Sequence, residues 1–256
     1  MAYVNSTAAK IYYETHGEGP AIIFAHGAGG NAAIWFNQIA SFKEHYQCAS
    51  FDHRSFARAP ALDANITIPD FRDDIIAIMD DLNIRSAHMV GQSMGGFSVL
   101  RCALDHPDRV ETLTLSCTPA GIPVSNPTEA VQDLGSRDAD GIKATMAKKT
   151  FENSALVELY SSIQSFNTEF SFDKLANLRR KDDQVPKERL KEIAIPTLFI
   201  SGKEDPLFPP NQLEQLVSLF ANARIEVVED AGHSPYFERP EVFNALLQDH
   251  LNDPQS

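Results

Sequence analysis

The sequence predicts an α/β fold in which a mostly parallel sheet is flanked by helices and interrupted by a helical insertion. Two observations predict it. Short apolar runs alternate with longer runs of helical periodicity, in the first half of the chain and again near its end. This pattern is typical of parallel strands joined by right-handed crossover helices. Between about residues 120 and 193, by contrast, there is no strand-like run.

The predicted strands are short and rich in aliphatic residues. AIIFAH is apolar throughout, as expected of a strand that is covered on both faces. The six predicted strands lie at 21–26, 47–52, 87–91, 110–116, 195–202 and 224–229.

The predicted helices carry apolar residues three and four positions apart, which forms one stripe along each helix. The first covers 69–82, where Pro69 and Asp70 suit a helix start. Another begins directly after Ser93, and two more cover 211–220 and 240–251.

The middle of the chain is predicted to be a helical cap. It opens with the turn formers TPAGIPVSNP and continues as a polar, helix-prone segment with scattered aromatic residues. So long a stretch without secondary structure would be improbable in a compact domain. We therefore expect a core of residues 1–120 and 193–256 and a cap of residues 121–192. Arg179 and Arg180 in LRRKDD are predicted to lie at the solvated end of a helix, and contact with an anionic substrate is the alternative.

Composition argues against several classes of partner. The net charge of −13 and the pI of about 5.0 disfavour nucleic acid and anionic lipid. No apolar run approaches the roughly 20 residues that span a bilayer. Three cysteines without CxxC spacing fit a reducing compartment, and the N-terminus does not resemble a secretory leader. We expect a cytoplasmic monomer or homodimer that binds neither nucleic acid nor membrane.

The stretch VGQSMGG puts Ser93 in a sharp turn between a predicted strand and a predicted helix. Gly91 and Gly95 are needed because side chains there would collide with the crowded turn, and G-x-S-x-G is the pattern of a nucleophile elbow. A serine hydroxyl becomes a nucleophile when it is exposed and a base takes its proton. The alternative is a glycine-rich turn with an incidental serine.

A second glycine-rich stretch, HGAGG at 26–30, follows the first predicted strand. Attack on a carbonyl creates an oxyanion, which preorganised N–H donors stabilise. The predicted donors are the backbone N–H groups of Ala28 and of Met94, the residue after the nucleophile. The alternative is an ordinary loop. The stretch lacks the G-x-G-x-x-G spacing of a dinucleotide-binding loop.

The base is expected to be a histidine, because imidazole can take and return a proton near neutral pH. His233 follows the strand predicted at 224–229, and sites in open α/β sheets gather beyond the carboxyl ends of strands. His53 also follows a strand end and is the second choice. His88 lies within a strand. Four others occupy polar, apparently exposed contexts: His16, His45, His106 and His250.

The acid that orients the base is expected after the strand at 195–202. SGKEDPLFPP offers Glu204 and Asp205, and we prefer Asp205 because the proline-rich turn after it would fix its carboxylate. The chain order Ser93, Asp205, His233 is that of α/β-hydrolases and not that of other serine-protease folds.

These motifs resemble those of the α/β-hydrolase superfamily, in its esterase, lactonase and C–C hydrolase branch. The resemblance covers residues 1–120 and 193–252 and is carried by HGAGG, FDHR, GQSMGG, ALDHPDRVETLTL, SGKEDPLFPP and DAGHSPYFERP. It implies a mostly parallel eight-stranded sheet, an inserted helical cap, and a triad of Ser93, His233 and Asp205 that needs neither cofactor nor metal. Epoxide hydrolases and haloalkane dehalogenases look similar but carry an aspartate nucleophile.

The resemblance implies that the substrate is a small carboxylic ester or lactone, cleaved through an acyl-enzyme. A C–C hydrolase of meta-ring-fission diketones is the first alternative, because Trp35 and Asn37 match the W-x-N of such enzymes, although HGAGGNAA fits their loop only in part. A serine-dependent perhydrolase and a receptor on a hydrolase scaffold are further alternatives.

His26 and Trp35 are predicted to line the substrate pocket. Trp35 would stand on the acyl side, although core packing accounts equally well for an apolar position in a helix.

One loop departs from the family pattern. Relatives read D-x-R-G-x-G-x-S, whereas this chain reads DHRSFARAP at 52–60, so Ser55 and Ala57 replace two glycines. If those positions have positive φ, each replacement costs roughly 1 kcal/mol. We expect a different loop path that brings Phe56 or Arg58 toward the site. Neutral drift in a surface loop is the alternative.

Overall fold

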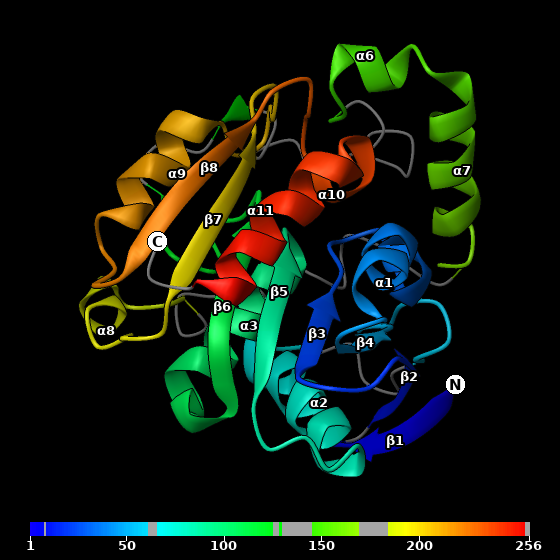
Figure 1. Cartoon of the computed structure of the whole chain (residues 1–256), viewed down its shortest axis with the longest axis vertical. Helices are drawn as coiled ribbons and strands as arrows, with labels where there is room; N and C mark the ends of the chain where they lie inside the picture. Colours follow the sequence, from blue (N-terminus) through cyan, green and yellow to red (C-terminus); the bar gives the residue numbers. More distant parts are fainter. Residues whose placement is uncertain (8, 61–65, 125–127, 130–144, 169–183, 254–256) are drawn as a thin grey trace.

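The computed structural model describes residues 1–7, 9–60, 66–124, 128–129, 145–168 and 184–253. Its described strands form one sheet of eight in the order β1-β2-β4-β3-β5-β6-β7-β8 (Figure 1). Only the pairs β1–β2 and β2–β4 are antiparallel. The predicted mostly parallel eight-stranded sheet is therefore confirmed. The strands are β1 (Ala2–Ser6), β2 (Ala9–His16), β3 (Ala21–Ala25), β4 (Gln47–Phe51), β5 (Ala87–Gln92), β6 (Val110–Ser116), β7 (Thr197–Gly202) and β8 (Ala223–Val228).

Strands β1 and β2 are absent from the six runs that the apolar pattern predicts. Exposure alternates along β1, as expected of an edge strand with one wet face. The two strands form a ribbon that extends the sheet beyond β4, away from β5 to β8. The six predicted strands are all present, with their ends shifted by at most two residues.

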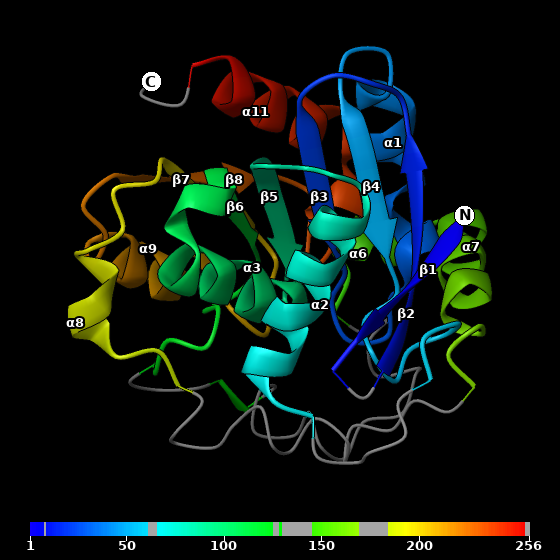
Figure 2. The same cartoon turned by 90° about the horizontal axis from the view of Figure 1, so that it is seen from below.

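Helices cover both faces of the sheet, and each face has its own hydrophobic core (Figure 2). In β3, Ile22 and Phe24 belong to one core and Ile23 to the other, because successive strand side chains point to opposite faces. One face carries α2 (Ile68–Asp81), α3 (Met94–Asp105) and α9 (Pro210–Val217), and the other carries η1 (Ala32–Trp35), α1 (Phe36–Phe42), α10 (Pro235–Glu238) and α11 (Pro240–Asn252). A short turn of helix, η2 (Pro107–Arg109), precedes β6.

The described elements between β6 and β7 are α6 (Lys148–Phe151), α7 (Ser154–Gln164) and α8 (Lys187–Leu190). They agree with the predicted helical character of this insertion. Arg179 and Arg180 lie outside the described residues, and the boundaries of the cap at 121 and 192 stay a prediction. None of the described helices combines the length and the apolar character that a membrane crossing requires.

The prediction that His250 is exposed was wrong. Its side chain is completely buried near the end of α11, where Nδ1 accepts a hydrogen bond from Arg224 at 3.2 Å. The polar residues around it in the sequence lie on the other side of α11, which a local composition argument does not resolve.

The DHRSFARAP loop has the strained backbone that its missing glycines imply. Ser55 has φ 69° and Ala57 has φ 38°, and the loop closes on itself with a bond from Ser55 N–H to the Ala59 carbonyl at 2.7 Å. Phe56 and Arg58 were the two side chains expected near the site. Of these, Phe56 is buried in a cluster that also contains Met94, the residue after Ser93. Arg58 instead binds Asp52 at 2.8 Å and does not turn toward the site.

Replacing Ala57 with glycine is expected to raise the free energy of unfolding, because glycine adopts positive φ without steric cost. The gain should be at most about 1 kcal/mol, since glycine also adds entropy to the unfolded chain. Urea unfolding measures it. Ala40→Gly, in the exposed part of helix α1, is the matched control and should lower the same quantity by about 1 kcal/mol. Equal losses in both variants would contradict strain at Ala57.

Candidate active site

The predicted site residues follow strands that end at one edge of the sheet. Strands β3, β5, β7 and β8 are parallel and are joined through β6, so their carboxyl ends lie together. HGAGG follows β3, Ser93 follows β5, Asp205 follows β7 and His233 follows β8. This is the edge at which open α/β sheets build their sites.

Ser93 sits in a strained turn between β5 and α3. Its backbone has φ 50° and ψ −116°, outside the regions that residues other than glycine favour. A Cβ on Gly91 would lie 2.6 Å from the Gly95 carbonyl oxygen, and one on Gly95 would lie 2.1 Å from the Ala25 carbonyl oxygen. The turn therefore requires both glycines, and it leaves the Ser93 side chain partly exposed. This is the geometry of a nucleophile elbow.

The HGAGG loop packs directly against this turn. A Cβ on Gly27 would lie 3.0 Å from the Ser93 Cβ. Residues 27 to 30 form a tight turn, closed by the Gly30 N–H on the Gly27 carbonyl at 3.0 Å, with Gly29 at φ 84°. This is a type II turn with Ala28 at its first central position.

Both predicted oxyanion donors are thus near the nucleophile. Met94 is the first residue of α3, so its N–H has no acceptor within the helix. Among the described residues, no backbone carbonyl or side chain accepts the Ala28 N–H. Their role as donors stays a prediction.

Asp205 and His233 are hydrogen bonded to each other, with 3.0 Å between Oδ2 and Nδ1. Both side chains are buried. The other carboxylate oxygen, Oδ1, accepts the N–H groups of Leu207 at 2.8 Å and Phe208 at 3.2 Å. The turn after β7 therefore fixes the carboxylate, as its prolines suggest. Glu204 is exposed and accepts the N–H of Lys148, so it does not face the imidazole.

The loop that carries His233 is tied to the elbow. Gln92, the residue before Ser93, donates from Nε2 to the His233 carbonyl at 2.8 Å. The His233 N–H donates to the Thr145 carbonyl in the insertion at 2.9 Å. The first bond joins the ends of β5 and β8, which β6 and β7 separate in the sheet, and the second joins the His233 loop to the insertion.

Glu238 is a functional candidate that the sequence analysis missed. Its Oε1 accepts the N–H groups on either side of the base, from Gly232 and Ser234, both at 3.0 Å. Its Oε2 accepts the N–H of Ala147 at 2.8 Å. Burial raises the pKa of Glu238, and these N–H donors oppose that effect. A glutamate five residues after the base, in HSPYFERP, was the available signal.

Replacing Glu238 with glutamine is expected to lower kcat about tenfold. The new NH₂ group cannot accept an N–H, so at least one buried donor beside His233 or at Ala147 loses its partner, at about 1–3 kcal/mol, and the base is less well fixed. Steady-state kinetics and urea unfolding measure the two effects. Glu241→Gln, an exposed glutamate three residues on, is the control and should change neither. Unchanged kcat with lower stability would restrict Glu238 to a structural role.

Cys117, directly after β6, joins the acid and the base in a buried cluster. One ligand atom each from Cys117, Asp205 and His233 lie within 4.8 Å of one another, and such a donor set suits zinc. The sulfur also accepts the Gly202 N–H at 3.4 Å. Burial raises the pKa of the Cys117 thiol well above its usual value. The Cys117 thiol donates to the Gly232 carbonyl at 3.7 Å, so Cys117 joins the end of β7 to the loop that carries His233.

His26 and His53 pack ring against ring under the HGAGG loop. Both are completely buried. His26 Nε2 accepts the His53 N–H at 3.0 Å and Nδ1 lies 2.7 Å from the Gly27 carbonyl, so the ring is neutral with its proton on Nδ1. Burial lowers the pKa of His26 to about 4 and that of His53 well below its usual value. His53 is therefore a buried packing residue, and its position does not support a role as the catalytic base.

Trp35 is completely buried, and its ring packs between Phe24 and Tyr236. It belongs to the core on the α1 and α11 face. Core packing, the alternative given above, accounts for its position. A direct substrate contact by His26 or Trp35 stays a prediction that these contacts do not support.

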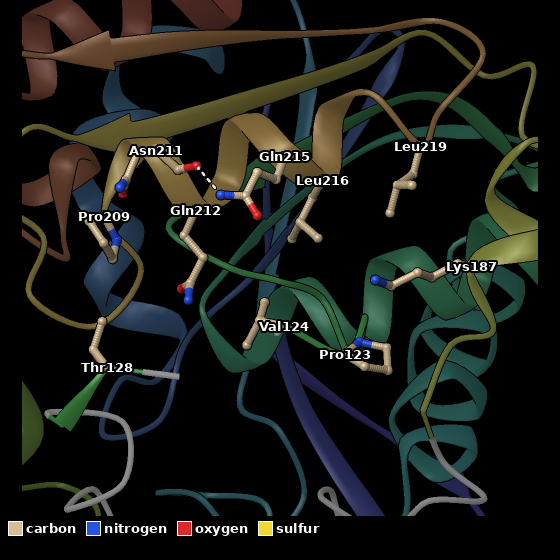
Figure 3. Close-up of a pocket in the computed structure, with 10 residues that line it drawn as sticks. All are labelled: Pro123, Val124, Thr128, Lys187, Pro209, Asn211, Gln212, Gln215, Leu216 and Leu219. Carbon is tan, nitrogen blue, oxygen red and sulfur yellow. Dashed lines mark hydrogen bonds between the residues drawn. The ribbon is translucent and has the colours of Figure 1, made fainter. Parts of the chain in front are cut away.

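A separate cavity of about 420 Å³ lies against α9 (Figure 3). Among the described residues that line it, Lys187 of α8 is the one charged residue, and Leu216 and Val124 are apolar. None of Ser93, Asp205 and His233 lines it. This cavity is therefore distinct from the predicted site.

Comparison with known proteins identifies the family of this chain. Residues 22–246 match the sequence profile of the alpha/beta hydrolase family. The chain belongs to this family. Est816, described as an N-acyl homoserine lactone degrading enzyme, has a similar structure, with a TM-score of 0.84, 26% identity and coverage of 96% of this chain and 99% of its own.

Two curated proteins match nearly the whole chain. The putative carbamate hydrolase RutD of Caulobacter sp. (strain K31) is 27% identical over 97% of this chain and 98% of its own. The 2-hydroxy-6-oxononadienedioate/2-hydroxy-6-oxononatrienedioate hydrolase of Burkholderia vietnamiensis is 29% identical over 97% of this chain and 94% of its own. These names cover several kinds of bond, so the family assignment leaves the substrate open.

Proposed function

We propose that this alpha/beta hydrolase cleaves a small carboxylic ester or lactone with a triad of Ser93, His233 and Asp205. The observation that carries the proposal is the 3.0 Å bond between the buried Asp205 carboxylate and His233, beside a strained elbow that presents Ser93. The link from Gln92 to the His233 carbonyl supports it, because it ties the base to the elbow.

In the first half of the reaction, Ser93 Oγ attacks the substrate carbonyl while His233 Nε2 takes its proton. The Asp205 carboxylate, bonded to Nδ1, holds the imidazole in this tautomer and stabilises its charged form. The negative oxygen of the tetrahedral intermediate accepts the N–H groups of Ala28 and Met94. The intermediate then collapses, the bond to the alkoxide breaks, and His233 returns the proton to the leaving oxygen.

In the second half, water attacks the acyl-enzyme. His233 takes a proton from the water, the same two N–H groups hold the oxyanion, and the acid product leaves as Ser93 regains its proton. For a lactone, the leaving hydroxyl and the acid belong to one molecule. The chemistry requires only these side chains, two N–H groups and water.

We propose that the insertion forms a cap over this site. Its described part is hydrogen bonded near the base and near the HGAGG loop. The Ala147 N–H donates to Glu238, which follows His233 in the chain, and the Asn31 side chain, directly after HGAGG, donates to the Ile163 carbonyl of α7 at 2.7 Å. A cap in this position would exclude water and shape the acyl pocket.

A substrate panel tests the proposed function. p-Nitrophenyl butyrate, an N-acyl homoserine lactone, an aryl carbamate and a meta-ring-fission diketone are compared by kcat/KM. We expect the ester or the lactone to give the highest value. Little action on either would contradict the proposal, and trapping of acyl-enzyme without turnover would indicate a receptor.

A C–C hydrolase is the second candidate, because the Burkholderia vietnamiensis relative, whose name gives a 2-hydroxy-6-oxo dienedioate or trienedioate substrate, is 29% identical over 97% of this chain. In that case the diketone would be turned over and p-nitrophenyl butyrate would not. The diketone is coloured, so loss of its absorbance measures the reaction directly.

A further inference from the structure

Asn167 lies just beyond the C-terminal end of α7, and its side chain touches two loops of the catalytic edge. Nδ2 donates to the carbonyl oxygens of Gly29 at 2.7 Å and Gly30 at 3.1 Å. Oδ1 accepts the N–H of Ala57 at 3.1 Å. One amide thus uses both of its N–H donors and its oxygen to join the HGAGG loop to the DHRSFARAP loop.

Both of these loops have backbone conformations that need support. Gly29 has φ 84° at the second central position of the turn that carries Ala28, and Ala57 has φ 38°. Such conformations persist where surrounding contacts hold them. Asn167 bonds the peptide groups on each side of Gly30 and the strained residue of the second loop.

A second asparagine, Asn31, directly after the HGAGG loop, is hydrogen bonded to α7. Asn31 is fully buried, and its Nδ2 donates to the Ile163 carbonyl in the last turn of α7 at 2.7 Å. The Asn167 N–H donates to the Gln164 carbonyl at 2.9 Å, which keeps Asn167 in the turn that ends the helix. The loop is therefore attached to the end of α7 at two points.

We propose that Asn167 is a positioning residue for the oxyanion hole, and that it holds the turn in which the Ala28 N–H is preorganised. The inference rests on the proposed function, because it assumes that Ala28 N–H binds the developing oxyanion. Preorganised donors are effective because they do not reorient during the reaction. Anchored carbonyls at Gly29 and Gly30 prevent rotation of these peptide groups and direct their negative ends toward Asn167.

Two substitutions at Asn167 distinguish a role in positioning the oxyanion hole from a role in stabilising the fold alone. Asn167→Ala removes all three bonds. Asn167→Asp keeps the size and the acceptor for Ala57, but its carboxylate faces the carbonyls of Gly29 and Gly30 and repels them. We expect kcat to fall about 10- to 100-fold in the alanine variant and further in the aspartate variant, with little change in KM.

Binding of a trifluoromethyl ketone, which forms a tetrahedral oxyanion adduct with the nucleophile, should weaken by the same factor as kcat/KM. The control is Asn153→Ala, at the other end of α7, where the side chain accepts only the Leu156 N–H. It should leave kcat and inhibitor binding unchanged.

The inference is overturned if Asn167→Asp keeps wild-type kcat, or if Asn167→Ala raises KM alone. It is also overturned if Asn153→Ala loses as much activity as Asn167→Ala, since the loss would then result from general destabilisation of α7. Failure of the proposed function has a different signature, because the Ser93→Ala variant would then retain esterase or lactonase activity whatever happens at Asn167.

Discussion

Replacing Ser93 with alanine is expected to lower kcat at least about 10³-fold, with the fold intact. The side chain is partly exposed and its hydroxyl has no part in the hydrogen bonds that close the elbow, whereas the backbone does: Ser93 N–H donates to Ser116 and its carbonyl accepts Gly96. The substitution therefore removes the nucleophile and keeps the turn. Turnover of the best substrate, with circular dichroism as the check on folding, measures the effect.

His233→Ala should lower kcat by a comparable factor, because residues that act as a unit lose activity together. The matched controls are Ser218→Ala and His45→Ala, at exposed positions away from the catalytic edge, and both should keep wild-type kcat. A fluorophosphonate should label the wild-type protein on Ser93, and peptide mapping would identify the labelled residue. Full activity in purified Ser93→Ala protein would refute the proposed mechanism.

Lowering the pH from about 7 to about 5 is expected to destabilise the protein strongly through its buried histidines. Burial lowers the pKa of His26 and of His250 from about 6.5 to about 4. Between these values the unfolded chain binds protons that the folded chain does not. The stabilisation is therefore complete above about pH 6.5 and is lost as the pH falls toward 4. At about pH 5 each of these histidines removes about 2 kcal/mol from the free energy of unfolding.

His53 adds to the loss in the same direction, because its pKa is also lowered by burial and by the neighbouring His26 and Arg54. Urea unfolding at the two pH values measures the sum. His250→Gln retains an acceptor for Arg224 and should reduce the pH dependence by about 2 kcal/mol, whereas His45→Gln, at an exposed site, should leave it as in wild type. Equal pH dependence in the wild type and in His250→Gln would contradict the prediction.

Much of the fold could be predicted from the chain because its strands are covered on both faces. Such strands must be apolar throughout, so AIIFAH or VETLTLS is visible without any partner. This reasoning misses β1, an edge strand whose exposure alternates, and β2, which has polar or exposed residues at both ends. His250 escapes it too, because burial in a helix depends on which direction a side chain points.

The site could be predicted in part because a nucleophile elbow imposes local requirements. The turn itself requires Gly91 and Gly95. At Ser55 and Ala57, other residues stand where relatives have glycine, and this difference predicts the positive φ angles that the structure has. Glu238 and Asn167 could not be found this way. Each forms hydrogen bonds to backbone groups of other segments. Every residue type except proline has both of these backbone groups, so the amino-acid sequence does not show which of them are bonded.

The sequence by itself determined six of the eight described strands with the main helices between them, the resemblance to alpha/beta hydrolases, and the candidates Ser93, Asp205 and His233. These follow from periodicity and from short motifs, in which neighbouring residues constrain one another. Only the tertiary structure decided that the acid meeting His233 is Asp205 and not Glu204, that His26, His53 and Trp35 are buried supports, and that α7 is bonded to the HGAGG loop. Those outcomes depend on side-chain direction and on contacts between residues that are distant in the sequence, such as Asp205 and His233, 28 positions apart, and Gly29 and Asn167, 138 positions apart. Folding alone brings such residues together.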